Sequence, residues 1–215
     1  MMDNLDRLAQ KWQNCWRDRP VDRVKLDHTL QLLVTAYTQS DRYYHNLTHI
    51  HQLLTTLDRF SDLFQDPLAV SLAAWFHDFI YAPQDTDNEA QSAKLASKLL
   101  TDIGLSIATC DRVHTLIMAT QGHQIEPHDP DLCIFLDADL AILGADPVGY
   151  QVYQRSIRRE YSWVADEAYR VGRIRVLESF LQRDRLYATD LLFGELESIA
   201  RLNIQQEIAS YSSPL

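Results

Sequence analysis

The chain has 215 residues, of which 46% are hydrophobic and 23% charged, a composition typical of one folded globular domain. Its formal net charge of −10 argues against partners such as nucleic-acid polymers, which favour a basic surface. Three cysteines without CxxC spacing indicate a reduced, cytoplasmic protein, and no apolar run approaches the roughly 20 residues of a membrane span. We therefore expect a single domain over residues 1–215 that does not use a membrane.

Nearly the whole sequence has the pattern of helices, with only six glycines and no long alternating stretch. Asp66, Asp129 and Asp146 each precede a proline and predict helix N-caps, while Gly104 and Gly144 predict helix ends. The fold class predicted is all-α. The expected helices lie near residues 4–17, 24–39, 46–60, 67–80, 88–103, 107–120, 130–143, 147–161, 165–184 and 190–209, with loops at 82–87 and 122–129.

The first candidate ligands are histidines in the segment RYYHNLTHIH, residues 42–51. His45 and His49 are four residues apart and share one helical face, whereas His51 points elsewhere. Leucines 53, 54 and 57 follow His49, so this helix is expected to pack against the core. A histidine bonded to a backbone carbonyl is the alternative for each of the three, and it is preferred for His51.

The doublet His77-Asp78 ends the apolar run LAVSLAAWF, residues 68–76, within the helix expected over 67–80. A carboxylate buried there loses its hydration, which requires a cation or strong hydrogen-bond donors in compensation. The neighbouring imidazole offers a nitrogen ligand about 100° away around the helix, so both side chains can reach one ion. A solvated helix end is the alternative interpretation.

A third segment, CIFLDADLAILG at residues 133–144, carries two aspartates in an apolar helix. Asp139 falls between the core positions Leu136 and Leu143, and Asp137 lies about 200° around from it. One of the two is therefore expected to bind a metal ion, while the other contacts an arginine or a ligand histidine. Buried salt bridges for both remain the alternative.

Together His49, His77, Asp78 and Asp139 offer two imidazoles and two carboxylates. This set suits one divalent metal ion, Mn, Fe, Co, Ni, Zn or Mg, and contains no thiolate that would close a structural zinc site. An ion preferring six ligands would retain positions for water or a phosphate oxygen, and would activate water for attack.

The order H…HD…D resembles the HD superfamily of metal-dependent phosphohydrolases. The likeness extends to a bacterial group of predicted HD phosphohydrolases and covers about residues 37–205, through the segments RYYHNLTH (42–49), WFHDFIY (75–81), NExxSA (88–93), DADLAILG (137–144), IRxEY (157–161) and ARxN (200–203). The resemblance implies a bundle of about five core helices around the metal, here a core of about 37–145 with C-terminal helices 147–209 packed on it. It also implies that His49, His77, Asp78 and Asp139 hold the ion, with Asp137 as the rival for the last position.

Further residues are candidates around the ion. Arg42 is the first choice for a phosphate clamp and Arg158 a second, although a solvated helix face is the usual role of an arginine. Glu89 is a candidate general acid or base, but a capping box over residues 86–89 explains it without catalysis. His45 is a candidate contact to a phosphoryl oxygen. His123 is a candidate phosphate or second-metal contact, and a plain loop histidine is an equal alternative for it.

The function expected from these residues is hydrolysis of a small phosphorylated metabolite, with a nucleotide among the candidates. A non-catalytic protein that binds a nucleotide or metal is the first alternative. An HD-type di-iron oxygenase is the second, and it would need further histidine ligands. A homo-oligomer is compatible with the sequence.

Overall fold

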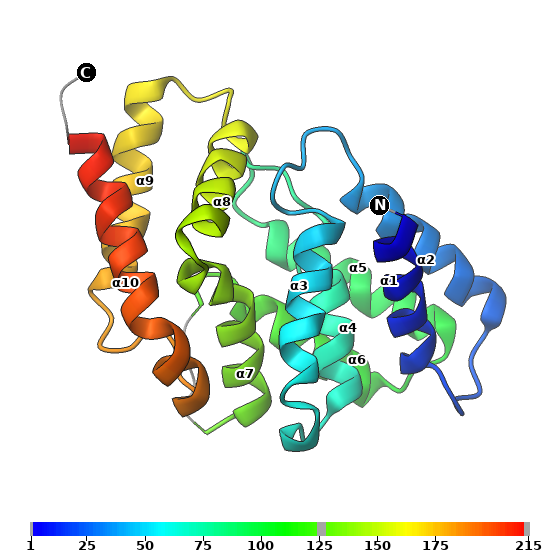
Figure 1. The fold of residues 1–215 in the computed structure, drawn as a ribbon. Helices are drawn as coiled ribbons and strands as arrows, with labels where there is room; N and C mark the ends of the chain where they lie inside the picture. Colours follow the sequence, from blue (N-terminus) through cyan, green and yellow to red (C-terminus); the bar gives the residue numbers. More distant parts are fainter. Residues whose placement is uncertain (1, 124–127, 213–215) are drawn as a thin grey trace. The chain divides into compact units, whose positions relative to one another are not determined.

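The computed structural model of the protein describes residues 2–123 and 128–212, and every regular element in these ranges is a helix (Figure 1). The predicted all-α class is therefore confirmed. The helices are α1 (Met2–Cys15), α2 (Arg23–Tyr37), α3 (Leu47–Asp58), α4 (Pro67–Phe76), α5 (Asn88–Ile103), α6 (Ile107–Ala119), α7 (Pro130–Asp139), α8 (Pro147–Glu160), α9 (Asp166–Leu181) and α10 (Asp190–Ser212), with short 3₁₀ helices η1 (Ser61–Leu63) and η2 (Leu140–Gly144). The predicted loop at 122–129 includes residues 124–127, which lie outside the described residues.

The chain divides into two compact units, residues 1–136 and 137–215, with the boundary inside α7. The first unit contains α1 to α6 and most of α7, and the second contains the end of α7, η2 and α8 to α10. The expected single domain with a core over about 37–145 stays a prediction.

The first unit is organised around α4, which contacts α1, α3, α5 and α6. Every residue of α4 from Leu68 to Phe76 except Ser71 is buried. A helix that is apolar on all sides can only be stable when neighbours cover its whole circumference. The position of α4 thus follows from its composition, and it brings the doublet that follows it into the interior.

Trp12 of α1 and Trp16, which follows α1 directly, close one side of α4. The rings of Trp12 and Trp16 lie 5.2 Å apart between centroids, and Trp12 lies 5.4 Å from Trp75 of α4, both edge-on. All three are fully buried, and their indole N–H groups have no hydrogen-bond partner among the described residues. Trp12 and Trp16 are therefore packing residues of the first unit.

The second unit has a buried polar network at its centre. Glu207 of α10 accepts hydrogen bonds from Arg173 of α9 at 2.9 Å and from the hydroxyl of Tyr150 of α8 at 2.6 Å. All three residues are buried. The guanidinium of Arg173 and the hydroxyl of Tyr150 compensate the negative charge of this carboxylate, which would otherwise be buried without a partner.

Most predicted helix ends are confirmed. The carboxylates of Asp66, Asp129 and Asp146 accept backbone N–H groups of the helices they precede. Gly104 caps α5 with a left-handed φ of 110°. Gly144 is the last residue of η2 and has no positive φ. It permits close approach, because a Cβ there would lie 2.6 Å from the Cβ of Leu196.

The helix predicted over 130–143 ends as an α-helix at Asp139 and continues as η2.

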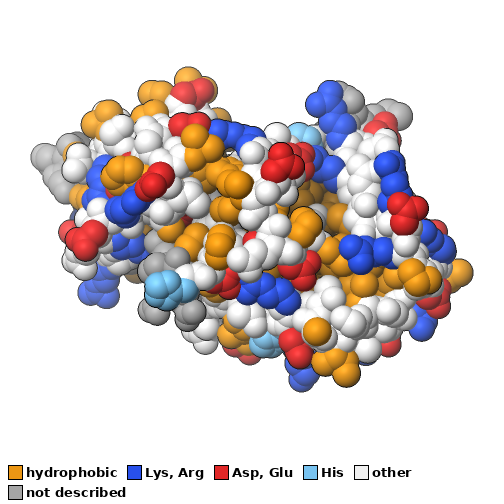
Figure 2. Space-filling model, turned by 90° about the horizontal axis from the view of Figure 1, so that it is seen from below, with side chains coloured by type: hydrophobic (Ala, Val, Ile, Leu, Met, Phe, Trp, Pro, Cys, Tyr) orange, Lys and Arg blue, Asp and Glu red, His pale blue; other side chains and the backbone are white. Residues whose placement is uncertain are grey.

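Acidic and basic side chains are interspersed with hydrophobic ones on the face drawn in Figure 2. Within the described ranges, no helix has both the length and the apolar character needed to cross a bilayer.

Candidate metal centre

His77 and Asp78 lie in the turn after α4, not within a helix that continues to residue 80. The predicted end of this helix is therefore wrong. Tertiary hydrogen bonds replace helical ones in this region: the Tyr37 hydroxyl donates to the carbonyl of Trp75 at 2.9 Å. Such bonds from distant side chains compete with the i→i−4 ladder and end it early.

The chain beyond the doublet is held by the start of α5. The backbone N–H of Ile80 donates to Ser92 Oγ at 2.9 Å. Asn88 exchanges two hydrogen bonds of 2.9 Å with the backbone N–H and carbonyl of Ala82. The polar residues of the 88–93 segment therefore fix the turn that carries the doublet.

Three donor atoms of His49, His77 and Asp78 lie close together. The two Nε2 atoms lie 3.1 Å apart, and Asp78 Oδ2 lies 2.9 Å from His77 Nε2 and 3.6 Å from His49 Nε2. His77 Nδ1 lies 3.1 Å from the carbonyl of Ala74, which can only accept, so Nδ1 carries a proton. In neutral His77 the Nε2 lone pair therefore faces the other two groups.

These spacings fit a divalent ion. Ligand atoms about 2.1 Å from a metal lie about 3.0 Å apart at right angles and about 3.4 Å apart in a tetrahedron. The two histidines are buried, and the lone pairs of two nitrogens and a carboxylate would repel one another without a proton or cation between them. The donor set and its spacing thus match a metal site of N and O ligands.

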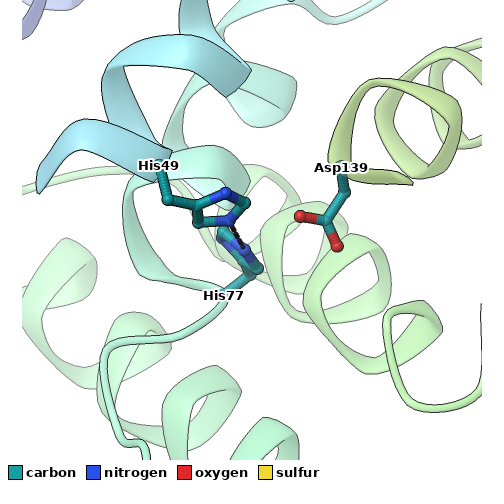
Figure 3. Close-up of side chains that lie close together, drawn as sticks. All are labelled: His49, His77 and Asp139. Carbon is teal, nitrogen blue, oxygen red and sulfur yellow. Dashed lines mark hydrogen bonds between the residues drawn. The ribbon is translucent and has the colours of Figure 1, made fainter. Parts of the chain in front are cut away.

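Asp139, in the last turn of α7, offers a further ligand. Four residues earlier in α7, and within the first unit, the ring of Phe135 lies edge-on to His77, with centroids 6.0 Å apart. One ligand atom from each of His49, His77 and Asp139 lies within 4.8 Å of the others. Figure 3 draws the side chains of these three residues, with the hydrogen bond between the two histidines dashed.

Electrostatics keep Asp78 ionised. Burial raises the pKa of its carboxyl group, but protonated His77, His45 and His49 outweigh burial through their charges and through the hydrogen bond that protonated His77 donates, and they lower the pKa below its usual range. A carboxylate that stays charged in a largely buried site is suited to binding a cation.

Asp137 has a different role from Asp139. Its carboxylate accepts the backbone N–H groups of Ala188 and Thr189, each at 2.7 Å, and the Thr189 hydroxyl at 2.6 Å. These contacts all belong to the second unit, where Asp137 holds the chain before α10. The two aspartates diverge as their spacing predicts, but the partner of Asp137 is a loop and not an arginine or histidine.

The predicted phosphate clamps are engaged elsewhere. Arg42 is buried and donates to the carbonyls of Asp78 at 2.6 Å and Phe79 at 2.8 Å. Arg158 donates to the carbonyl of Tyr161 at 2.7 Å and to Asp166 at 2.5 Å within the second unit. Both arginines hold backbone turns, and their role as phosphate clamps stays a prediction.

The remaining candidate residues lie in different surroundings. The ring of His45 lies 4.2 Å from that of Tyr81 between centroids, tilted by 30°, and His45 contributes to the charge around Asp78. Glu89 is half-buried in the first turn of α5, and the predicted capping box is wrong, because the N-cap is Asp87 without a side-chain cap bond. His123 lies after α6 with a left-handed φ of 49° and is not part of the ligand group.

Sequence reasoning gave no role to Tyr44, whose ring lies 4.9 Å from both His45 and His49. Its neighbourhood in the YYH segment was the only available signal.

Comparison of the chain with family models, with curated proteins and with solved structures gives no match.

Proposed function

We propose that the protein is a metal-dependent phosphohydrolase of the HD type that acts on a small phosphorylated compound, such as a nucleotide. The observation that carries the proposal is the convergence of His49 Nε2, His77 Nε2 and Asp78 Oδ2 within 3.6 Å. Asp139 would complete the ligand set. Its place in the order H…HD…D supports the resemblance noted from sequence.

Each residue has a defined part in this proposal. The four ligands would hold the ion, which when bound supplies a Lewis acid and lowers the pKa of water. Ala74 fixes the proton of His77 on Nδ1 and leaves Nε2 for the ion. His45, whose ring lies 4.2 Å from that of Tyr81, would contact a phosphoryl oxygen. Glu89 stays the candidate for proton transfer.

The test combines metal analysis of the purified protein with a phosphoester panel in Mn²⁺, Co²⁺, Ni²⁺ and Mg²⁺. We expect hydrolysis that depends on the ion. The variant His77→Ala/Asp78→Ala should bind the metal at least about 100-fold more weakly and should lose this hydrolysis. The matched control is Asp111→Ala/His114→Ala, a pair exposed on α6 of the same unit.

Turnover retained by the metal-free His77→Ala/Asp78→Ala protein would contradict the mechanism. Stoichiometric nucleotide binding without turnover would instead favour a regulatory protein. Two bound iron ions with oxygen-dependent chemistry would favour an oxygenase.

A further inference from the structure

Arg42 joins the two segments that carry the candidate ligands of the first unit. It is 6% exposed and sits between α2 and α3. Its Nη1 donates to the carbonyl of Asp78 at 2.6 Å and to that of His45 at 3.3 Å, and its Nη2 donates to the carbonyl of Phe79 at 2.8 Å. One guanidinium thus connects the chain before α3 with the turn after α4.

Aromatic rings hold this guanidinium in place. Its central carbon lies 5.0 Å from the ring centroid of Tyr37 and 5.6 Å from that of Tyr81. A planar guanidinium combines such ring contacts with several directed N–H bonds, whereas an ammonium offers a point charge. The arrangement therefore depends on arginine and not on positive charge alone.

The bonds to Arg42 matter because the His77-Asp78 turn lies outside α4. The carbonyls of Asp78 and Phe79 accept from Arg42 where a continuing helix would have supplied backbone partners. Metal sites tolerate ligand displacements of only about 0.2 Å. The position of this turn relative to α3 therefore determines whether the ligand atoms match one ion.

We propose that Arg42 is a positioning residue that sets the spacing between His49 and the His77-Asp78 pair, and thereby the affinity of the site for a divalent ion. The inference rests on the proposed function, because it assigns Arg42 to the same metal site. It replaces the phosphate clamp expected from sequence with a role exerted through the backbone.

The test is a Co²⁺ titration followed by visible absorption, which reports both affinity and coordination geometry. We expect Arg42→Lys to bind Co²⁺ about 10- to 100-fold more weakly than the wild type, as for other groups that orient metal ligands. In Arg42→Ala, added methylguanidinium should restore part of the affinity. Circular dichroism establishes that each variant is folded.

Arg201 provides a matched control in the second unit. It donates to the carbonyls of Leu181, Arg183 and Asp184 and pairs with Glu197. Arg201→Lys therefore removes the same kind of carbonyl contacts, and should change Co²⁺ affinity by less than about twofold, as expected for independent sites.

If Arg42→Lys binds Co²⁺ as tightly as the wild type does, and inorganic phosphate inhibits its hydrolytic activity more weakly, the inference is overturned. Arg42 would then be the phosphate clamp expected from sequence. If Arg42→Lys does not fold, Tyr81→Leu is titrated in its place, and unchanged affinity there would overturn it equally. If the wild type binds no ion, the proposed function fails. Nitrogen-15 spectra of the histidine rings in metal-free protein then decide: unchanged His49 and His77 signals in the variant would refute positioning.

Discussion

Asp78 in the first unit is a half-buried carboxylate and Glu207 in the second a buried one, and their neighbours differ. Glu207 is surrounded by donors, the guanidinium of Arg173 and the hydroxyl of Tyr150. Asp78 instead faces two imidazole nitrogens that can themselves act as acceptors. A carboxylate among donors is already satisfied, whereas one among groups with lone pairs requires additional positive charge. The contrast separates a structural acid from a candidate ligand.

The strongest way to break this contrast in the second unit is Glu207→Ala. It leaves Arg173 charged and buried without its carboxylate, so we expect a loss of about 3–5 kcal/mol in the free energy of unfolding. Urea unfolding measures the loss, and Co²⁺ affinity of the folded variant should not change. The control is Gln206→Ala, exposed on the same helix. A loss below about 1 kcal/mol would contradict the structural role of Glu207.

Asp137 and Asp139 test the same contrast two residues apart. Asp137→Asn should cost about 1–3 kcal/mol of stability by disturbing the bonds from Ala188 and Thr189, and should retain Co²⁺ affinity. Asp139→Asn should weaken Co²⁺ binding with a smaller effect on unfolding. The opposite pattern would assign the metal ligand to Asp137.

The pH dependence of Asp137 has a defined sign. Burial raises the pKa of its carboxyl group, although hydrogen bonds from Thr189 and Ala188 oppose the shift. The folded state then binds a proton more tightly than the unfolded state, so this group stabilises folding increasingly as pH falls through the raised pKa. Asp137→Asn should remove that slope in unfolding measured from pH 7 to about pH 4.

Asp129 in the first unit should give the smallest effect, with the opposite sign. The hydrogen bond from Arg112 lowers the pKa of its carboxyl group, and burial only partly opposes this. The stabilisation is present above the unfolded pKa of about 3.9 and is lost as pH falls through the lowered pKa. Asp129→Asn should therefore cost about 1 kcal/mol at pH 7. The difference in urea midpoint should vanish in strong acid, and a constant difference would contradict the ion pair.

Local signals were sufficient for the helices and for several of their ends. Asp66 and Asp146 stand next to prolines, and their cap bonds form with residues three positions away. The proximity of His49 to His77 and Asp78 was expected mainly from a resemblance in residue order, because spacing alone does not determine which helices meet. Whether they bind an ion stays a prediction.

Non-local contacts explain what the sequence could not predict. Phe79 and Ile80 continue the apolar pattern of α4, and the bonds that end this helix come from Arg42 and Ser92, far along the chain. Gly144 is needed because α10 approaches it at Leu196, a fact that no local pattern contains.

The four tryptophans are divided unevenly between the units. Trp12, Trp16 and Trp75 are buried around α4, whereas Trp163, between α8 and α9, is 53% exposed. An indole shielded from water fluoresces at shorter wavelength than one in contact with it. We therefore expect the emission spectrum to have a blue component from the three buried tryptophans of the first unit and a red component from Trp163 of the second. One of the three, Trp75, precedes His77 by two residues. Each unit has its own optical label.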